Sequence, residues 1–367
     1  MSLRRTPFYG KHIELKGKMV DFLGWSLPVQ YEGIIAEVQK VRQSAGIFDV
    51  SHMGEILVEG KGALPFLQKI ATNDISRLKA HGIMYSPVCY SSGGTVDDIL
   101  IYCYNPEKYL LVVNASNAQK DLAWLKEHCS GIVTVRDISE DIAQIALQGP
   151  NSLEILLSLT DKSLAVLKYY TFVPEARVAG IKCLISRTGY TGEDGFEVYC
   201  QASEARELWG EIWSAGGEDG LGLAAAGLGA RDILRLEAAL PLYGHELTAD
   251  ITPLDAGLDR FVSFTKGINF IGRGALVKQK EEGTLKRLCG LEMLERGIAR
   301  EGYSVRAQEE EVGWVSSGSY SPTLDKAVAL AFLNPEHAPL GNQVQVVIRG
   351  REYNARVVKI PFYRREK

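Results

Sequence analysis

ISRTGYTGEDGFEVY, residues 185–199, reads as two short strands joined by a polar loop. The strands are predicted at Cys183–Arg187 and Phe196–Cys200, and the loop Thr188–Gly195 between them contains three glycines. Glycine gives the backbone freedom and lets a ligand approach it closely. The loop is therefore either a long turn or the rim of a binding pocket.

Alternation along the second strand divides its side chains between two faces. Phe196, Val198 and Cys200 share one face, while Glu197 and Tyr199 share the other. The sequence thus predicts that Glu197 points away from the apolar row.

The composition is that of an ordinary globular protein with two or three domains, since 367 residues exceed the usual size of one. The formal net charge of -4 argues against a nucleic-acid partner. The sequence has no apolar run long enough to span a membrane, and the start MSLRRTPFYG has no signal-peptide core. We therefore expect no membrane partner and a cytoplasmic location.

The cysteines and histidines give little support for a metal. Six cysteines occur without a CxxC pair, and the six histidines form neither HxxxH nor HExxH. Most of the cysteines sit in apolar runs, so buried reduced thiols are expected.

Periodicity predicts helices in the first two thirds of the chain and β structure after Gly283, where we expect an all-β terminal domain built as a small barrel. No repeat of fixed period is evident. The predicted helices are residues 33–45, ending at Gly46, then 63–70, 117–129, 203–216 and one from near Gly229. Trp209 and Trp213, four residues apart, favour a packed helix face over a ligand platform.

A hairpin is predicted around Asn105 and Pro106. Counting outward from this turn places Asp98 opposite Asn114, or one residue off, and a slip of one residue would put the two side chains on opposite faces. Asp97 and Asp98 are adjacent in a strand, so they are not expected to form an acid/base pair.

Two other motifs have competing interpretations. Gly220, Gly222 and Ala225 fit GxGxxA, but no strand precedes them, which argues against a dinucleotide site. Arg231 and Arg235 lie four apart on one helix face, either as a solvated stripe, which is the default, or to receive a carboxylate. His52 could be a satisfied core histidine.

The chain resembles the aminomethyltransferase, or T-protein, family of the glycine cleavage system. The resemblance runs through the whole sequence and is carried by the blocks FDVSHMG, TND, GGTVDD, VVNASN, LQGP, SRTGYTGEDGFE, GLGARD, LRLEA, LYGHEL and SPT. It implies an α+β fold, a three-domain cloverleaf around a central folate channel. The expected domains are residues 1–50 with 140–277, residues 51–139 carrying the catalytic aspartate, and a β-barrel at 284–367.

The resemblance also implies a reaction. The carbon of an aminomethyl group, held as a thioether on the lipoyl arm of H-protein, passes to tetrahydrofolate, giving 5,10-methylenetetrahydrofolate and ammonia. Tetrahydrofolate and lipoylated H-protein are thus the expected partners, with no metal, flavin or nicotinamide. The alternatives are a folate-binding regulatory or assembly protein without turnover, and a folate domain that uses another amine donor.

The resemblance assigns roles to single residues. Asp98 matches the family's catalytic carboxylate, and Glu197 matches the glutamate that hydrogen-bonds the pterin ring. Arg231 matches an arginine near the glutamate tail of folate. The other matched ligand contacts are Met53, Tyr85, Asn114 and Tyr190, and, more loosely, Tyr363 and Arg364.

Overall fold

The computed structural model describes residues 2–217 and 220–365. The chain divides into two compact units. The first consists of Met1–Leu67, Ile75–Tyr85 and Ile99–Asp232, and the second of Gln68–Asp74, Ser86–Asp98 and Ile233–Lys367. The three domain ranges expected from the sequence stay a prediction.

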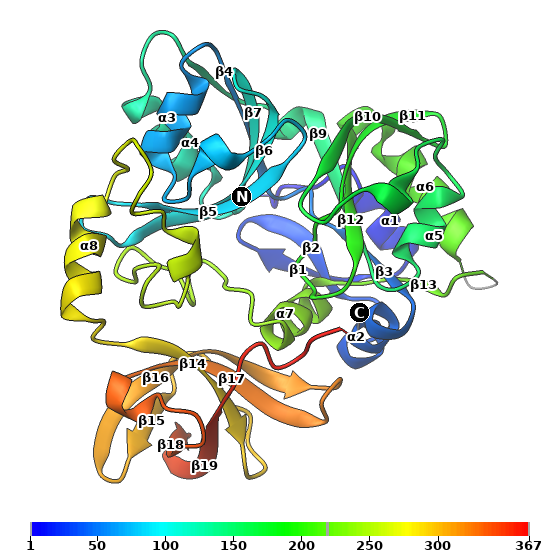
Figure 1. Ribbon diagram of the computed structural model, residues 1–367. Coiled ribbons are helices and arrows are strands. Elements are labelled where there is room, and N and C mark those ends of the chain that lie inside the picture. Colours follow the sequence, from blue (N-terminus) through cyan, green and yellow to red (C-terminus); the bar gives the residue numbers. More distant parts are fainter. Residues whose placement is uncertain (1, 218–219, 366–367) are drawn as a thin grey trace. The chain divides into compact units, whose positions relative to one another are not determined.

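Two sheets form the framework of the first unit, although residues 86–89 and 95–98 of the five-stranded sheet are assigned to the second (Figure 1). The five-stranded sheet has the order β5 (Ile83–Cys89), β6 (Thr95–Asn105), β7 (Lys108–Val113), β4 (Gly54–Glu59), β8 (Thr134–Asp137). The six-stranded sheet has the order β10 (Phe172–Val178), β11 (Ile181–Ser186), β12 (Gly195–Gln201), β9 (Ile142–Gln148), β3 (Ala45–Asp49), β13 (Leu223–Ala225). Strands β1 (Lys18–Phe22) and β2 (Trp25–Gln30) form a separate hairpin.

The helices agree with the periodicity of the sequence to within two residues at most ends. They are α1 (Tyr9–Glu14), α2 (Ile34–Gln43), α3 (Ala63–Ile70), α4 (Ala118–His128), α5 (Ser152–Leu157), α6 (Ala205–Gly216), α7 (Leu228–Glu237) and α8 (Arg273–Glu282). The predicted stop at Gly46 is wrong, because Gly46 lies inside β3. A Cβ at that position would come within 2.4 Å of Val41, so the glycine lets α2 pack closely on the strand.

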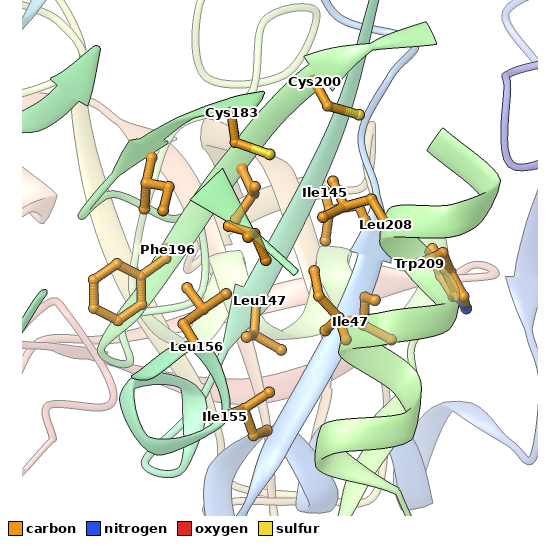
Figure 2. Packing of buried hydrophobic residues seen from close by; sticks show 14 of the residues in the cluster. Ile47, Ile145, Leu147, Ile155, Leu156, Cys183, Phe196, Cys200, Leu208 and Trp209 are labelled. Atoms are coloured by element: carbon orange, nitrogen blue, oxygen red, sulfur yellow. The ribbon is translucent and has the colours of Figure 1, made fainter. Parts of the chain in front are cut away.

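The quoted hairpin and helix α6 meet in one core. Figure 2 shows Phe196 and Cys200 of β12 and Leu208 and Trp209 of α6 in the same buried cluster. The predicted alternation is confirmed, since Tyr199 belongs to a different cluster on the other face of the strand. The packed-face interpretation of α6 is also confirmed, because Trp209 is 1% exposed.

The first unit contains an internal duplication that the sequence reading missed. The chain order β4-α3-β5-β6-β7-α4-β8 is followed by β9-α5-β10-β11-β12-α6-β13, and strands pair in the same order in both sheets, with β3 inserted in the second. Gly60 and Gly149, which follow β4 and β9, have φ of 125° and 124°. We call residues 54–137 the first repeat and residues 142–225 the second.

The two repeats meet through reciprocal contacts. Ile83 N–H donates to the Tyr170 carbonyl, and Phe172 N–H donates to the His81 carbonyl, both at 2.9 Å. Between the facing sheets lies a cluster drawn from both repeats. Its buried members are Ile83, Tyr102, Leu110, Val112, Phe172, Leu184 and Tyr199.

The second unit ends in a closed barrel of six antiparallel strands, which confirms the predicted all-β terminal domain (Figure 1). The strands are β14 (Arg287–Met293), β15 (Ser304–Ala307), β16 (Glu310–Ser321), β17 (Lys326–Leu333), β18 (Gln343–Ile348) and β19 (Arg351–Val358). Alternate residues such as Leu291, Val305 and Val346 fill the interior with little or no exposure.

Candidate functional site

Glu197 is the centre of a buried polar cluster in the first unit. Its side chain is carried by β12, and the residue is 7% exposed. Thr188 donates to its Oε2 at 2.6 Å, and the hydroxyls of Tyr102 and Tyr199 donate to the same oxygen at 3.4 Å. Every hydrogen bond that this carboxyl accepts from described residues therefore ends on Oε2.

The two tyrosines join both repeats into one hydrogen-bond network. Their hydroxyls lie 2.8 Å apart, and Gln144 Nε2 donates to Tyr199 at 2.9 Å. Burial, followed by the negative charge of Glu197, raises the pKa of both tyrosines well above the usual range. Both hydroxyls therefore stay protonated. Because each has a single proton, one can donate to the carboxylate while the other donates to its neighbouring tyrosine.

Arg231 supplies a positive charge that interacts with Tyr190 and Glu197. Its guanidinium carbon lies 4.8 Å from the centroid of the Tyr190 ring, a cation–π contact. Burial lowers the pKa of Arg231, while Tyr190 and Glu197 act in the opposite sense. The structure thus brings three of the predicted residues into one electrostatic group.

His52 is buried but is not a fully satisfied core histidine. It packs edge-on against Phe22 at 5.6 Å, yet Nδ1 has no hydrogen-bond partner within the described part of the chain. Burial and the neighbouring Arg231 lower the pKa of His52 to about 4, so the ring is neutral near pH 7.

Most of the glycine-rich loop Thr188–Gly195 is a turn held in place by ion pairs. Its acidic pair is used in ion pairs, Glu193 with Arg42 at 2.8 Å and Asp194 with Arg187 through both carboxyl oxygens. A Cβ at Gly189 would come within 1.8 Å of the Gln148 amide oxygen, so the glycine here makes room for a side chain. Of the loop's polar side chains, Thr188 and Tyr190 are the ones that face the polar cluster and Arg231.

Glu55 is a second buried carboxyl near this cluster. It is 1% exposed, and neither carboxyl oxygen has a hydrogen-bond partner among the described residues. Burial, followed by the charges of Asp137 and Glu197, raises its pKa well above the model-compound value of 4.5. The Ser139 hydroxyl opposes this shift only in part, because it donates its own proton to Asp137.

The predicted site residues fall in both units. Met53, Tyr85, Asn114, Tyr190, Glu197 and Arg231 belong to the first, and Asp98, Tyr363 and Arg364 belong to the second. Asp97 is fully buried and Asp98 half-buried, as expected for neighbours on opposite faces of a strand. The hairpin pairs Leu100 with Val112. Continuing this register by two residues on each strand would place Asp98 opposite Asn114 rather than one residue off, but the pairing of those two residues stays a prediction.

The expectation of a solvated arginine stripe is wrong for Arg235. Arg235 is 2% exposed, and its guanidinium donates to Glu246 at 2.9 Å and to Ser317 at 2.8 Å. Glu237, two residues further along the chain at the end of α7, accepts from Ser321 and Thr323. The LRLEA, LYGHEL and SPT blocks therefore contribute to fixing the end of α7, residues 233–237, to the barrel within the second unit.

The GxGxxA match does not open a helix after a strand. Gly220 and Gly222 lie between α6 and β13, and Ala225 is the last residue of β13, so the glycines precede a strand. No group of metal-binding side chains occurs among the residues that the structure describes. In the same residues we find no helix with the length and apolarity needed to cross a membrane.

The sequence reading missed most of the partners of Glu197. Tyr199 could have been found, because it shares a strand face with Glu197. Tyr102, Gln144 and Glu55 come from other strands. Gln144 reaches Tyr199 through the pairing of β9 with β12 inside the second repeat, whereas Tyr102 and Glu55 are brought close by the meeting of the two repeats. No local motif marks these three positions.

Comparison with known proteins supports the resemblance to the T-protein family. The model of the GCVT N-terminal domain matches residues 8–266, and that of the glycine cleavage T-protein C-terminal barrel domain matches residues 286–364. An aminomethyltransferase of Moorella thermoacetica is 55% identical over 366 residues, covering 100% of this chain and 99% of the relative. One of Natranaerobius thermophilus is 52% identical over 362 residues, covering 99% of each.

A solved structure shows the same fold. The crystal structure of the glycine cleavage system aminomethyltransferase T from Bartonella henselae has a TM-score of 0.91 at 32% identity, and covers 99% of this chain and 98% of that one. The fold and these relatives define an enzyme that transfers one-carbon units. The chain belongs to the T-protein family of the glycine cleavage system, a family that uses tetrahydrofolate as substrate.

Proposed function

We propose that this aminomethyltransferase holds the pterin ring of tetrahydrofolate with Glu197 and uses Asp98 as its catalytic carboxylate. The observation that carries the proposal is the geometry at Glu197. Hydroxyl donors hold Oε2 in place, which leaves Oε1 without a bond from any described residue. A carboxylate held in one orientation is well suited to accept hydrogen bonds from an amino-pyrimidine edge.

Asp98 has the chemistry that the transfer needs. As N5 of the folate bonds to the incoming carbon, it must lose a proton, and an iminium-like intermediate is cationic. A half-buried carboxylate can accept or relay the proton and stabilise the positive charge. Overall, the carbon–sulfur and carbon–nitrogen bonds of the aminomethyl carrier break while its carbon bonds to N5 and N10 of the folate. The two protons that N5 and N10 lose end on the regenerated thiol and on the departing ammonia.

The remaining assignments follow the family. Lipoylated H-protein is the proposed donor, and Arg231, stacked on Tyr190, is proposed to lie near the folate glutamate tail. Met53, Tyr85, Asn114, Tyr363 and Arg364 are proposed ligand contacts. That the chain needs no metal, flavin or nicotinamide, has no nucleic-acid or membrane partner and is cytoplasmic remains a prediction.

The test is formation of methylenetetrahydrofolate from tetrahydrofolate and H-protein loaded with the aminomethyl group. We expect turnover by the wild type and a loss of at least about 100-fold in kcat for Asp98→Asn, the range of general acid–base effects. Undiminished turnover in Asp98→Asn would remove Asp98 from the mechanism. Folate binding without product would favour a regulatory protein, and turnover without H-protein would favour another amine donor.

A further inference from the structure

The C-terminal barrel carries an open cavity of about 510 Å³ at its surface, bordered by exposed arginines, that none of the roles above uses. Arg349 and Arg351 border it from the turn between β18 and β19, and Arg300 borders it from the segment before β15. A volume of this size is in the range of small-molecule sites.

The three arginines give the cavity an unbalanced positive charge. None of them forms an ion pair with a residue that the structure describes. The acidic residues next to them in the chain are engaged elsewhere: Glu301 lies 3.5 Å from His245, and Glu352 lies 2.9 Å from Arg306. Arg300 is held by a bond from Nη1 to the Gly318 carbonyl at 3.1 Å.

The rest of the lining is aromatic and aliphatic. Tyr303 and Tyr353 contribute rings, and Ile298 and Ile348 contribute apolar surface. The segment before β15 packs closely on the β18–β19 hairpin at Gly297, where an added Cβ would lie 3.0 Å from Ile348 and 3.1 Å from Tyr353. The cavity is therefore set by packing between two segments of the barrel.

We propose that this cavity binds a small organic anion with two acidic groups and an apolar or aromatic body. The guanidinium fork matches the oxygens of a carboxylate or phosphate, and that chemistry is common to both kinds of ligand. Tyrosine and isoleucine side chains would receive the hydrocarbon part. The cavity is separate from Glu197, which lies in the other unit.

The turn allows a variant that removes charge without damaging the fold. Arg349 has φ of 51° and is followed by Gly350 with φ of 81°, a two-residue hairpin turn with both central residues in the left-handed region. Asn-Gly is the preferred pair for such a turn. Arg349→Asn should therefore keep the hairpin, and Arg351→Gln keeps the length of most of its side chain.

The experiment is calorimetric titration of the full chain with phthalate and, separately, 4-carboxyphenyl phosphate, in which a phosphate replaces one of the two carboxylates. We expect one saturable site for at least one probe, and weakening of at least about tenfold in Arg349→Asn/Arg351→Gln. The two probes distinguish carboxylate from phosphate preference. As a control, Arg287→Gln removes an exposed positive charge from the barrel outside the cavity and should leave the affinity unchanged.

Three outcomes would overturn the proposal. They are no saturable binding of either probe up to about 10 mM, a Kd unchanged in the double variant, or equal weakening in the double variant and Arg287→Gln. The last would mean that the probes respond to net charge alone. Thermal unfolding of each variant shows whether the barrel stays folded, so that a loss of binding can be ascribed to the arginines.

Discussion

The two repeats of the first unit share a strand order but carry different kinds of side chain, polar in one and apolar in the other, at equivalent buried positions. Ser186 pairs with Glu197 in the second repeat, where Tyr102 pairs with Leu110 in the first. Across the next strand, Glu197 pairs with Ala146, where Leu110 pairs with Leu57. The position that holds a buried carboxylate in one repeat therefore holds leucine in the other.

The same comparison explains why the Glu55 carboxyl has no hydrogen-bond partner among the described residues. Glu55 pairs with Val112, and the equivalent pair in the second repeat is Gln144 with Tyr199. Gln144 donates to the Tyr199 hydroxyl, but valine offers no such group. Burial without a donor disfavours the charged form of a carboxyl, whereas hydrogen bonds from hydroxyl groups favour that form.

Among the changes that test this comparison of the repeats, Glu197→Gln should have the largest effect on the KM for tetrahydrofolate. We predict that Glu197→Gln raises the KM for tetrahydrofolate by roughly 10–100-fold, because hydrogen bonds to a charged group contribute about 1.5–3 kcal/mol. The measurement is initial rate against tetrahydrofolate concentration with H-protein in excess. Leu110→Met at the equivalent position of the first repeat is the control and should leave KM unchanged. Equal KM values for Glu197→Gln and wild type would show that the polar repeat is not the binding repeat.

Removing one hydroxyl from the polar repeat should have a smaller effect. Tyr199→Phe deletes a donor to Glu197 and the acceptor of Gln144, so we predict a KM increase of a few fold and a loss of about 1 kcal/mol in stability. Kinetics and thermal unfolding of the same preparation measure the two effects. Tyr104→Phe, at a partly buried hydroxyl with no hydrogen bond among those described, is the control. An identical response in both variants would mean that the network gives Glu197 no support.

The sequence predicts the elements of both repeats because their signals are local. Alternation orients Glu197, helical spacing finds α6, and Asn105 with Pro106 marks the hairpin. The duplication escapes such reading because the repeats share apolar positions and turns while their inward-facing residues differ in chemistry. Glu197 and Leu110 are chemically dissimilar residues, although they occupy equivalent positions in the two repeats.

The partners of the site could not be predicted for a related reason. Tyr102 and Glu197 are hydrogen-bonded although they come from different repeats, and sequence spacing says nothing about which faces will meet. Arg235 shows the same limit, because its helix spacing fits exposure and burial equally well. Its partner Glu246 is brought to it by a turn rather than by helix geometry. Tertiary pairing decides these cases.

The smallest effect on the reaction is expected at Glu55, where the comparison makes a prediction about pH. Its folded-state pKa is raised, so the neutral form stabilises the fold fully below the unfolded-state value near 4.5. This contribution is lost as pH rises toward the folded-state pKa, because the unfolded chain releases the proton first. Glu55→Gln carries no such proton. It should be more stable than wild type above about pH 5, by about 1 kcal/mol or roughly 2–4 °C in Tm near neutral pH, and its KM should change by less than about twofold.

The measurement is the Tm difference between Glu55→Gln and wild type from pH 5 to pH 8, which should grow with pH. Position 144 shows that glutamine fits this place in the framework, and Gln144→Glu makes the reverse exchange. That variant adds a carboxyl beside Tyr199 and Glu197, so its Tm should fall below that of wild type as pH rises. A Tm difference that is flat with pH in both variants would mean that Glu55 is ionised in the fold. The contrast between an uncharged first repeat and a charged second repeat would then be wrong.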